Sequence, residues 1–237
     1  IFNYHHFQKL IIFYMLQNLK NENISILFDL DGTFADTSLD LCYALNILLK
    51  KNNKPAVDES EIKFHISRGA EGLINFGFGN EVSSKEKIKL RRKFLDLYDE
   101  QTTQYVTLID GIANLIDEIE SNKIVWGIVT NKQAKFATKI LKVLNYHDRA
   151  SCLVTGDMVD RAKPAPDSLI LACFKLNKEP ESSIYIGDDR RDVIAGQRAK
   201  MKTAIADFGF INSNYNINDW NADIILSKPS ELIKYII

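Results

Sequence analysis

The sequence predicts an α/β fold, a doubly wound parallel sheet that carries an inserted helical subdomain. Five short apolar runs recur along the chain, and amphipathic helical patterns separate the last four of them. The long stretch between the first two runs lacks this alternation and shows helical patterns throughout. We therefore expect an open sheet with helices on both faces and a separate helical unit inserted after the first strand.

The expected strands are apolar at nearly every residue, which is typical of strands buried on both faces of a parallel sheet. They occupy residues 24–30, 123–131, 150–156, 182–188 and 202–208. Helices are predicted over residues 133–145, 166–177 and 190–200, so that the last four strands join through right-handed crossovers. The C-terminal residues 220–237 are predicted to form a short strand and a closing helix.

The inserted subdomain is predicted to span residues 36–108. Its expected helices cover residues 37–51, 60–66, 69–77 and 84–104, with loops at 51–55 and 77–80. Residues 21–35 and 109–237 then form the core. Residues 1–20 are interpreted as an N-terminal extension, because the apolar run at 10–16 lacks the flanks of a secretory signal.

Composition excludes several classes of protein. The 237 residues carry 30 Lys and Arg against 31 Asp and Glu, so no basic field is available for a nucleic acid. No apolar run has the length of a membrane span. Cys42, Cys152 and Cys173 are widely spaced and form no CxxC pair, which argues against a disulfide framework and a cysteine zinc site. The cysteine pattern favours a reducing, cytoplasmic location.

Acidic residues follow two of the expected strands. Asp29 and Asp31 come at the end of the first strand, and carboxylates at i and i+2 on an extended segment point the same way. Asp188, Asp189 and Asp192 follow the fourth strand, where they could also serve only as helix caps. Because ligands bind beyond the carboxyl ends of parallel strands, the two groups together favour a Mg²⁺ site over a solvated Asp-Gly turn.

Phosphate-binding side chains are predicted at the other strand ends. Thr130 and Asn131 end the second strand and can donate hydrogen bonds to phosphate oxygens, although a Thr-Asn pair is also a common helix entry. Lys163 follows the third strand and offers a compact positive charge, although most lysines are simply solvated. Their position beside the acidic groups favours a phosphate site.

These residues resemble the four motifs of the haloacid dehalogenase (HAD) superfamily. DxDGT at Asp29, a Thr-Asn, a Lys-Pro and GDDxxD at Asp188 occur in that order, over residues 24–237. The insert is similar to the helical cap of the phosphoglycolate phosphatase-like subgroup. The resemblance implies a Mg²⁺-dependent phosphatase that forms an aspartyl-phosphate, because the dehalogenases of the superfamily lack the acid at Asp31.

The resemblance also implies a role for each site residue. Asp29 would be the nucleophile and Asp31 the general acid and base. The metal would be held by Asp29, the backbone carbonyl of Asp31, and Asp188, with Asp189 and Asp192 supporting it. The phosphoryl group would be bound by Thr130, Asn131 and Lys163, and Gly32 would let the backbone approach it.

The expected substrate is a small phosphate monoester, with 2-phosphoglycolate as the main prediction and N-acetylmuramic acid 6-phosphate as the alternative. Both substrates carry a carboxylate, and Arg68 in the cap is predicted to bind it unless it is merely a solvated arginine. A sugar-phosphate mutase and a catalytically silent binding module are further alternatives. No nucleic acid or membrane partner is expected, and the chain is expected to be a monomer or homodimer.

Overall fold

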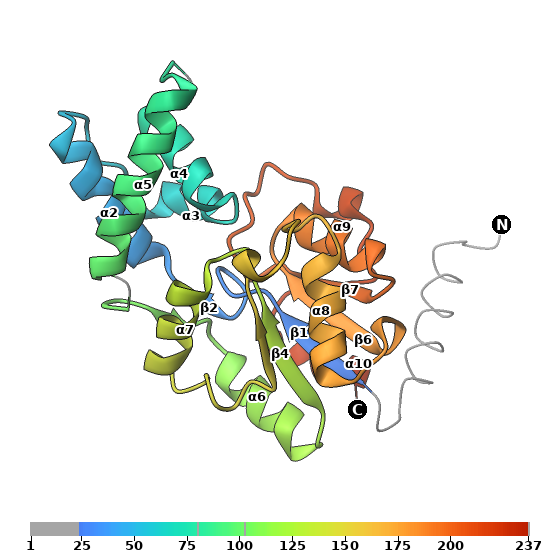
Figure 1. Cartoon of the computed structure of the whole chain (residues 1–237). Helices are drawn as coiled ribbons and strands as arrows, with labels where there is room; N and C mark the ends of the chain where they lie inside the picture. The colour runs from blue at the N-terminus through green and yellow to red at the C-terminus, as the bar shows by residue number, and fades with distance from the viewer. Residues whose placement is uncertain (1–23, 80, 102, 237) are drawn as a thin grey trace.

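The computed structural model describes residues 24–79, 81–101 and 103–236 (Figure 1). Within these residues, six parallel strands form one sheet in the order β5-β4-β1-β6-β7-β8. The strands are β1 (Ser25–Phe28), β4 (Val125–Val129), β5 (Cys152–Val154), β6 (Ser183–Gly187), β7 (Lys202–Ala206) and β8 (Ile224–Leu226). The chain winds outward from β1 in both directions, which confirms the doubly wound sheet.

Helices cover both faces of this sheet. They are α6 (Ile112–Ser121), α7 (Ala134–Val143) and α10 (Ile233–Ile236) on one face, and α8 (Asp167–Leu176) and α9 (Arg190–Arg198) on the other. Ile26 and Phe28 of β1 pack into the first layer, whereas Leu27 packs into the second. This alternation explains why β1 is apolar at every position.

The inserted subdomain has an apolar core of its own and stands apart from the sheet (Figure 1). Its helices are α2 (Ser38–Lys51), α3 (Glu59–Ile66), α4 (Gly69–Phe78) and α5 (Ser84–Gln101). Leu45, Leu73 and Phe94 are among its fully buried side chains. Two short antiparallel strands, β2 (Ala35–Asp36) and β3 (Thr107–Leu108), join the subdomain to the core.

The structure confirms the predicted fold class and adds elements that the patterns did not indicate. Most strands are shorter than predicted by one or two residues at an end, so that Asp29 and Thr130 directly follow β1 and β4. Helix α6 and the β2–β3 pair were not predicted, and two-residue strands are too short to show a period. Short 3₁₀ turns also occur, at η1 (Gly156–Met158), η2 (Pro180–Ser182), η3 (Ile217–Trp220) and η4 (Pro229–Leu232).

Two predictions from the sequence concern the N-terminal extension and the three cysteines. The predicted extension over residues 1–20 lies outside the described residues. Cys42, Cys152 and Cys173 are all buried free thiols. None of the described helices combines the length and the apolarity that a bilayer crossing requires.

The sheet order brings the polar strand ends together. β1 lies between β4 and β6, so the residues that follow these three strands meet at one edge. The Asp29 amide, directly after β1, donates to the carbonyl of Ile186 in β6 at 2.8 Å. The cap helices lie above this same edge (Figure 1).

Candidate active site

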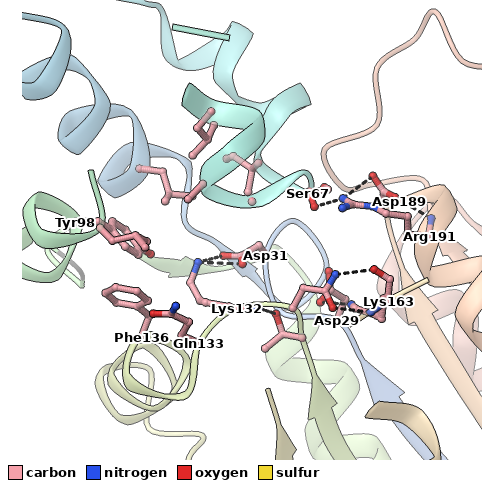
Figure 2. A pocket seen from close by; sticks show the side chains of 18 of the residues that line it. Asp29, Asp31, Ser67, Tyr98, Lys132, Gln133, Phe136, Lys163, Asp189 and Arg191 are labelled. Carbon is pink, nitrogen blue, oxygen red and sulfur yellow. Dashed lines mark hydrogen bonds and ion pairs between the residues drawn. The ribbon is translucent and has the colours of Figure 1, made fainter. Parts of the chain in front are cut away.

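Asp29 lines a cavity between the sheet edge and the cap (Figure 2). Its carboxylate is 10% exposed, and its Oδ1 accepts a hydrogen bond from Lys163 Nζ at 2.8 Å. Its Oδ2 accepts none from the described residues, so one oxygen is available for chemistry. Burial raises the pKa of Asp29 to about 7, against the opposing charge of Lys163.

Lys163 is a buried ammonium that holds two carboxylates at once. Its Nζ lies 2.8 Å from Asp29 Oδ1 and 2.7 Å from Asp192 Oδ1. It also donates to the Tyr185 hydroxyl at 2.6 Å. Burial favours the neutral amine, yet the charges of Asp192 and Asp29 raise the pKa of Lys163 above its usual value. A permanent positive charge therefore faces the Asp29 carboxylate.

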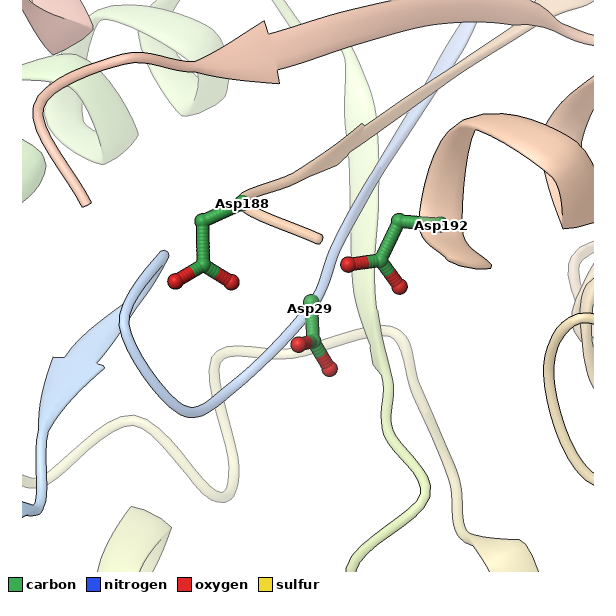
Figure 3. Close-up of side chains that lie close together, drawn as sticks. All are labelled: Asp29, Asp188 and Asp192. Atoms are coloured by element: carbon green, nitrogen blue, oxygen red, sulfur yellow. The ribbon is translucent and has the colours of Figure 1, made fainter. Parts of the chain in front are cut away.

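Asp29, Asp188 and Asp192 form a buried acidic triad (Figure 3). Their nearest oxygens lie within 4.8 Å of one another, and the three residues come from the end of β1, the end of β6 and the start of α9. Burial and repulsion by the other two carboxylates raise the pKa of Asp188 well above its usual value.

The triad fits a divalent cation. Its three buried carboxylates lie within 4.8 Å of one another, and the Lys163 ammonium bonds only Asp29 and Asp192. Carboxylate oxygens are ligands that Mg²⁺ takes. Both Asp192 oxygens are already engaged, by Lys163 Nζ and by the Asp189 amide at 3.1 Å. Among the described residues, Asp29 keeps Oδ2 free, whereas Asp188 accepts from the Thr33 hydroxyl at Oδ1 (3.4 Å) and from the Phe210 amide at Oδ2 (3.0 Å). Each Asp188 oxygen accepts one hydrogen bond and has a second lone pair, and the predicted ligand set stays a prediction. The Asp31 carboxylate lies outside the triad, and its predicted contribution is only a backbone carbonyl.

Gly32 closes the turn after Asp31 with a φ of +79°, in the left-handed region. A Cβ added there would lie 2.2 Å from Asp188 Oδ2 and 2.8 Å from the Phe210 ring. The turn and the Asp188 carboxylate therefore fit together only because residue 32 has no side chain.

We expect Gly32→Ala to destabilise the fold by more than the roughly 1–2 kcal/mol that a left-handed φ costs an alanine, and to lower activity. The measurement is urea unfolding with paired phosphatase assays. Gly69→Ala is the matched control, because Gly69 has a φ of +66° and no atom within 4 Å of an added Cβ. Equal losses in the two variants would show that the contact with Asp188 does not constrain residue 32.

Asp31 is held by a lysine that the sequence patterns did not indicate. Lys132 Nζ lies 2.8 Å from Asp31 Oδ1 and 3.0 Å from Oδ2, and the Thr37 hydroxyl donates to Oδ1 at 2.5 Å. Burial opposes the charge on Lys132, but Asp31 and Tyr98 raise its pKa above the usual value. The pair fixes the Asp31 carboxylate beside the cavity.

Thr130 and Asn131 lie in the loop after β4, as predicted, and line the cavity. The Thr130 hydroxyl accepts a hydrogen bond from the Lys132 amide at 3.1 Å. The Asn131 side-chain amide donates to the Lys163 carbonyl at 3.0 Å, and its Oδ1 accepts from the Lys163 amide at 2.9 Å. Asn131 therefore positions the Lys163 loop, and its predicted contact with phosphate stays a prediction.

Asp189 and Arg191 connect the core to the cap (Figure 2). Asp189 caps α9 by accepting from the Arg191 amide, and its carboxylate also bonds the Arg191 side chain at 2.9 Å. Burial opposes ionisation, yet Arg191 holds the pKa of Asp189 below its usual range. The Arg191 guanidinium also donates to the Ser67 carbonyl in the cap. The Asp189 carboxylate is thus engaged away from the acidic triad.

Arg68 is not among the residues that line the main cavity. Its guanidinium donates to the Tyr215 hydroxyl at 3.0 Å, and the residue lines two neighbouring grooves, one of which Arg91 also lines. Its predicted role in binding a substrate carboxylate stays a prediction.

Sequence reasoning missed Lys132, Tyr185 and Arg191. Lys132 directly follows Thr130-Asn131, so its position after the strand was the available signal. Tyr185 lies within an apolar strand, and nothing in that pattern indicates that its hydroxyl would contact Lys163. Arg191 has no sequence signal for its contact with the cap, because Ser67 is 124 residues away.

Comparisons with known proteins agree with this fold and site. Residues 26–206 match the family of haloacid dehalogenase-like hydrolases. The chain is 39% identical over 209 residues to an N-acetylmuramic acid 6-phosphate phosphatase of Pseudomonas aeruginosa, across 88% of this chain and 92% of that protein. It is 29% identical over 208 residues to a phosphoglycolate phosphatase of Xanthomonas campestris, across 88% and 94% of the two chains.

A solved structure shows the same fold. It is a predicted phosphoglycolate phosphatase from Haemophilus somnus, which is 24% identical, with a TM-score of 0.78 over 88% of this chain and 96% of that one.

The chain belongs to the haloacid dehalogenase-like hydrolase family, as the resemblance implied. Within that family it is a phosphatase, a hydrolase of phosphoric monoesters. The relatives differ in the substrate that their names give, so the family fixes the reaction class and leaves the leaving group open.

Proposed function

We propose that this phosphatase hydrolyses N-acetylmuramic acid 6-phosphate through an aspartyl-phosphate on Asp29. The observation that carries the substrate is the 39% identity to the Pseudomonas aeruginosa enzyme of that name, which exceeds the 29% identity to the phosphoglycolate phosphatase. The higher identity supports the alternative substrate over phosphoglycolate, the main prediction from sequence. The aspartyl-phosphate chemistry is supported by the hydrogen bond that Lys163 donates to Asp29 Oδ1, which leaves Oδ2 free to attack.

In the first proposed step, Asp29 Oδ2 attacks the phosphorus atom and the ester bond breaks. The leaving alkoxide takes a proton from the Asp31 carboxyl, so the sugar departs as a neutral alcohol. Lys163 holds Asp29 through Oδ1 and leaves Oδ2 free, which supports this orientation. Thr130 and Lys163 face the position that the phosphoryl oxygens would occupy.

In the second step, water attacks the phosphorus of the acyl phosphate. The Asp31 carboxylate takes the proton from this water, and the bond between phosphorus and Asp29 breaks to release inorganic phosphate. Asp31 thus returns to its protonated form and Asp29 to its carboxylate. Lys132 and Thr37 hold Asp31 in place for both transfers.

Mg²⁺ is the proposed cofactor, held by Asp29 and Asp188 with the backbone carbonyl of Asp31. When bound, it neutralises phosphate charge and favours the charge that develops during transfer. Asp192 supports the site through its contact with Lys163.

We expect metal removal to abolish phosphate release, and added Mg²⁺ to restore it. In Asp188→Asn, the Mg²⁺ concentration for half-maximal activity should rise at least about 10-fold, because a buried ligand is lost. Asp160→Asn is the control, since Asp160 is exposed and outside the triad. Full activity after chelation, or equal Mg²⁺ requirements in the two variants, would contradict the metal assignment.

The substrate is tested with a panel of phosphate monoesters under saturating Mg²⁺. It contains N-acetylmuramic acid 6-phosphate, 2-phosphoglycolate, glucose 6-phosphate, glucose 1-phosphate and an aryl phosphate. The proposal expects the highest kcat/KM for the muramic acid ester. The highest value for 2-phosphoglycolate would restore the sequence-based prediction, and release of phosphate from none would favour a binding module.

A further inference from the structure

The cavity above Asp29 is lined by four cations among the described residues: Arg91, Lys132, Lys163 and Arg191. Three of them already bond carboxylates. Lys132 holds Asp31, Lys163 holds Asp29 and Asp192, and Arg191 holds Asp189. Arg91 has no hydrogen bond or ion pair within the described part of the chain. Among the cations that line the described cavity, Arg91 is therefore the one without a carboxylate partner.

Arg91 lies on the side of α5 that faces the cavity. Phe94, Leu95 and Tyr98 also line the cavity, and together with Arg91 they have the i, i+3, i+4, i+7 spacing of one helical stripe. The rest of this stripe is apolar or aromatic. Arg92 is the next residue; both arginines are exposed, but only Arg91 lines the cavity. An arginine at position 91 is thus placed at the ligand space, whereas its neighbour is not.

The position of Arg91 along α5 sets a distance from the reacting groups. At the inner end of the stripe, Tyr98 lies beside Lys132, whose Nζ is 5.1 Å from the Tyr98 ring centre and 2.8 Å from Asp31. Arg91 is seven residues away along the helix, which corresponds to a rise of about 10 Å. We therefore expect an anion held by Arg91 to lie farther from the reacting groups than the atoms bonded directly to the phosphate ester.

This separation suits the lactyl carboxylate of N-acetylmuramic acid 6-phosphate and not the carboxylate of phosphoglycolate. In phosphoglycolate, the carboxylate is attached to the carbon that bears the phosphate ester. In N-acetylmuramic acid 6-phosphate, a hexose ring lies between the phosphate and the lactyl carboxylate. The walls of the intervening cavity, which include Phe94, Leu95 and Phe136, offer apolar contacts to a sugar ring.

We propose that Arg91 binds the leaving-group carboxylate and is the specificity-determining cation of the cap. This rests on the proposed function, and it differs from the prediction that Arg68 has this role. A guanidinium binds a carboxylate through two parallel hydrogen bonds, and Arg91 can form both because no described residue engages its donors.

The test compares two sugar phosphates that differ in one group. N-acetylmuramic acid 6-phosphate carries the lactyl carboxylate, and N-acetylglucosamine 6-phosphate is the same ring without it. In Arg91→Gln we expect kcat/KM for the first to fall about 10- to 100-fold, mostly through KM. For the second we expect a change below about 2-fold. Arg91→Lys should give an intermediate loss, because a lysine keeps the charge without the fork.

Arg92→Gln is the matched control and should behave as the wild type on both sugars. Arg68→Gln separates the two assignments, and we expect it to lack a carboxylate-selective loss. Melting temperatures of all variants confirm that each is folded.

Three outcomes would overturn the proposal. They are an equal effect of Arg91→Gln on both sugars, equal hydrolysis of both sugars by the wild type, and a carboxylate-selective loss in Arg68→Gln alone. Failure of the proposed function looks different, because the wild-type enzyme would then prefer phosphoglycolate and hydrolyse neither sugar well.

Discussion

Asp29→Asn should reduce phosphate release by about 10⁴-fold or more, because an amide oxygen cannot replace the attacking carboxylate. The substitution keeps the shape of a buried side chain that contacts Lys163, so the protein should remain folded. The measurements are kcat on the preferred ester and on an aryl phosphate, together with a thermal unfolding curve. No phosphorylated protein should be trapped from this variant.

Asp31→Asn is the informative companion, because it keeps the nucleophile and removes the acid and base. The aryloxide of an aryl phosphate leaves readily without receiving a proton, so this variant should still become phosphorylated on Asp29 and then lose the phosphate slowly. Acid quenching followed by mass spectrometry would detect the phosphorylated peptide that contains Asp29. Full activity in Asp29→Asn, or a phosphopeptide elsewhere in the chain, would disprove the nucleophile assignment.

Lys163→Met should cost about 3–5 kcal/mol of unfolding free energy as well as activity. Lys163 is almost fully buried, and its removal leaves the carboxylates of Asp29 and Asp192 without their shared positive charge. A substitution that leaves buried charges without their partner has one of the largest effects on stability that single substitutions show. Chemical denaturation at neutral pH, without added metal, measures it.

Lys175→Met is the matched control, because Lys175 is exposed on α8, and it should change stability by less than about 0.5 kcal/mol. Adding Asp192→Asn to Lys163→Met should recover part of the lost stability, because it removes one of the two unpaired charges. An unchanged stability in Lys163→Met would contradict the network of Lys163 with the two carboxylates.

The architecture was largely predictable because its signals are local. A strand buried on both faces must be apolar at consecutive residues, as β1 and β6 are, and an amphipathic helix must repeat its apolar residues. The β2–β3 pair has two residues in each strand and leaves no such pattern. Helix α6 was also missed, although its apolar residues Ile112, Leu115, Ile116 and Ile119 follow helical spacing.

The site was predictable to the extent that it depends on strand ends. Asp29, Thr130, Lys163 and Asp188 all line or adjoin one cavity because β1, β4, β5 and β6 are parallel and neighbouring. The partners of these residues were not predictable. The pairing of Asp31 with Lys132 joins residues 101 positions apart, and it depends on the order of the strands in the sheet.

The sequence by itself determined the class of fold and the positions of the polar residues after each strand, because these follow from periodicity and from the chemistry of adjacent side chains, and its resemblance to the haloacid dehalogenase superfamily implied the reaction class. Only the tertiary structure decided which side chains meet. It placed Arg68 against Tyr215 and Arg91 on the wall of the cavity, although both are arginines of the cap. The physical reason is that orientation depends on how the cap helices pack over the sheet edge, and contacts at long separation leave no local pattern in the chain.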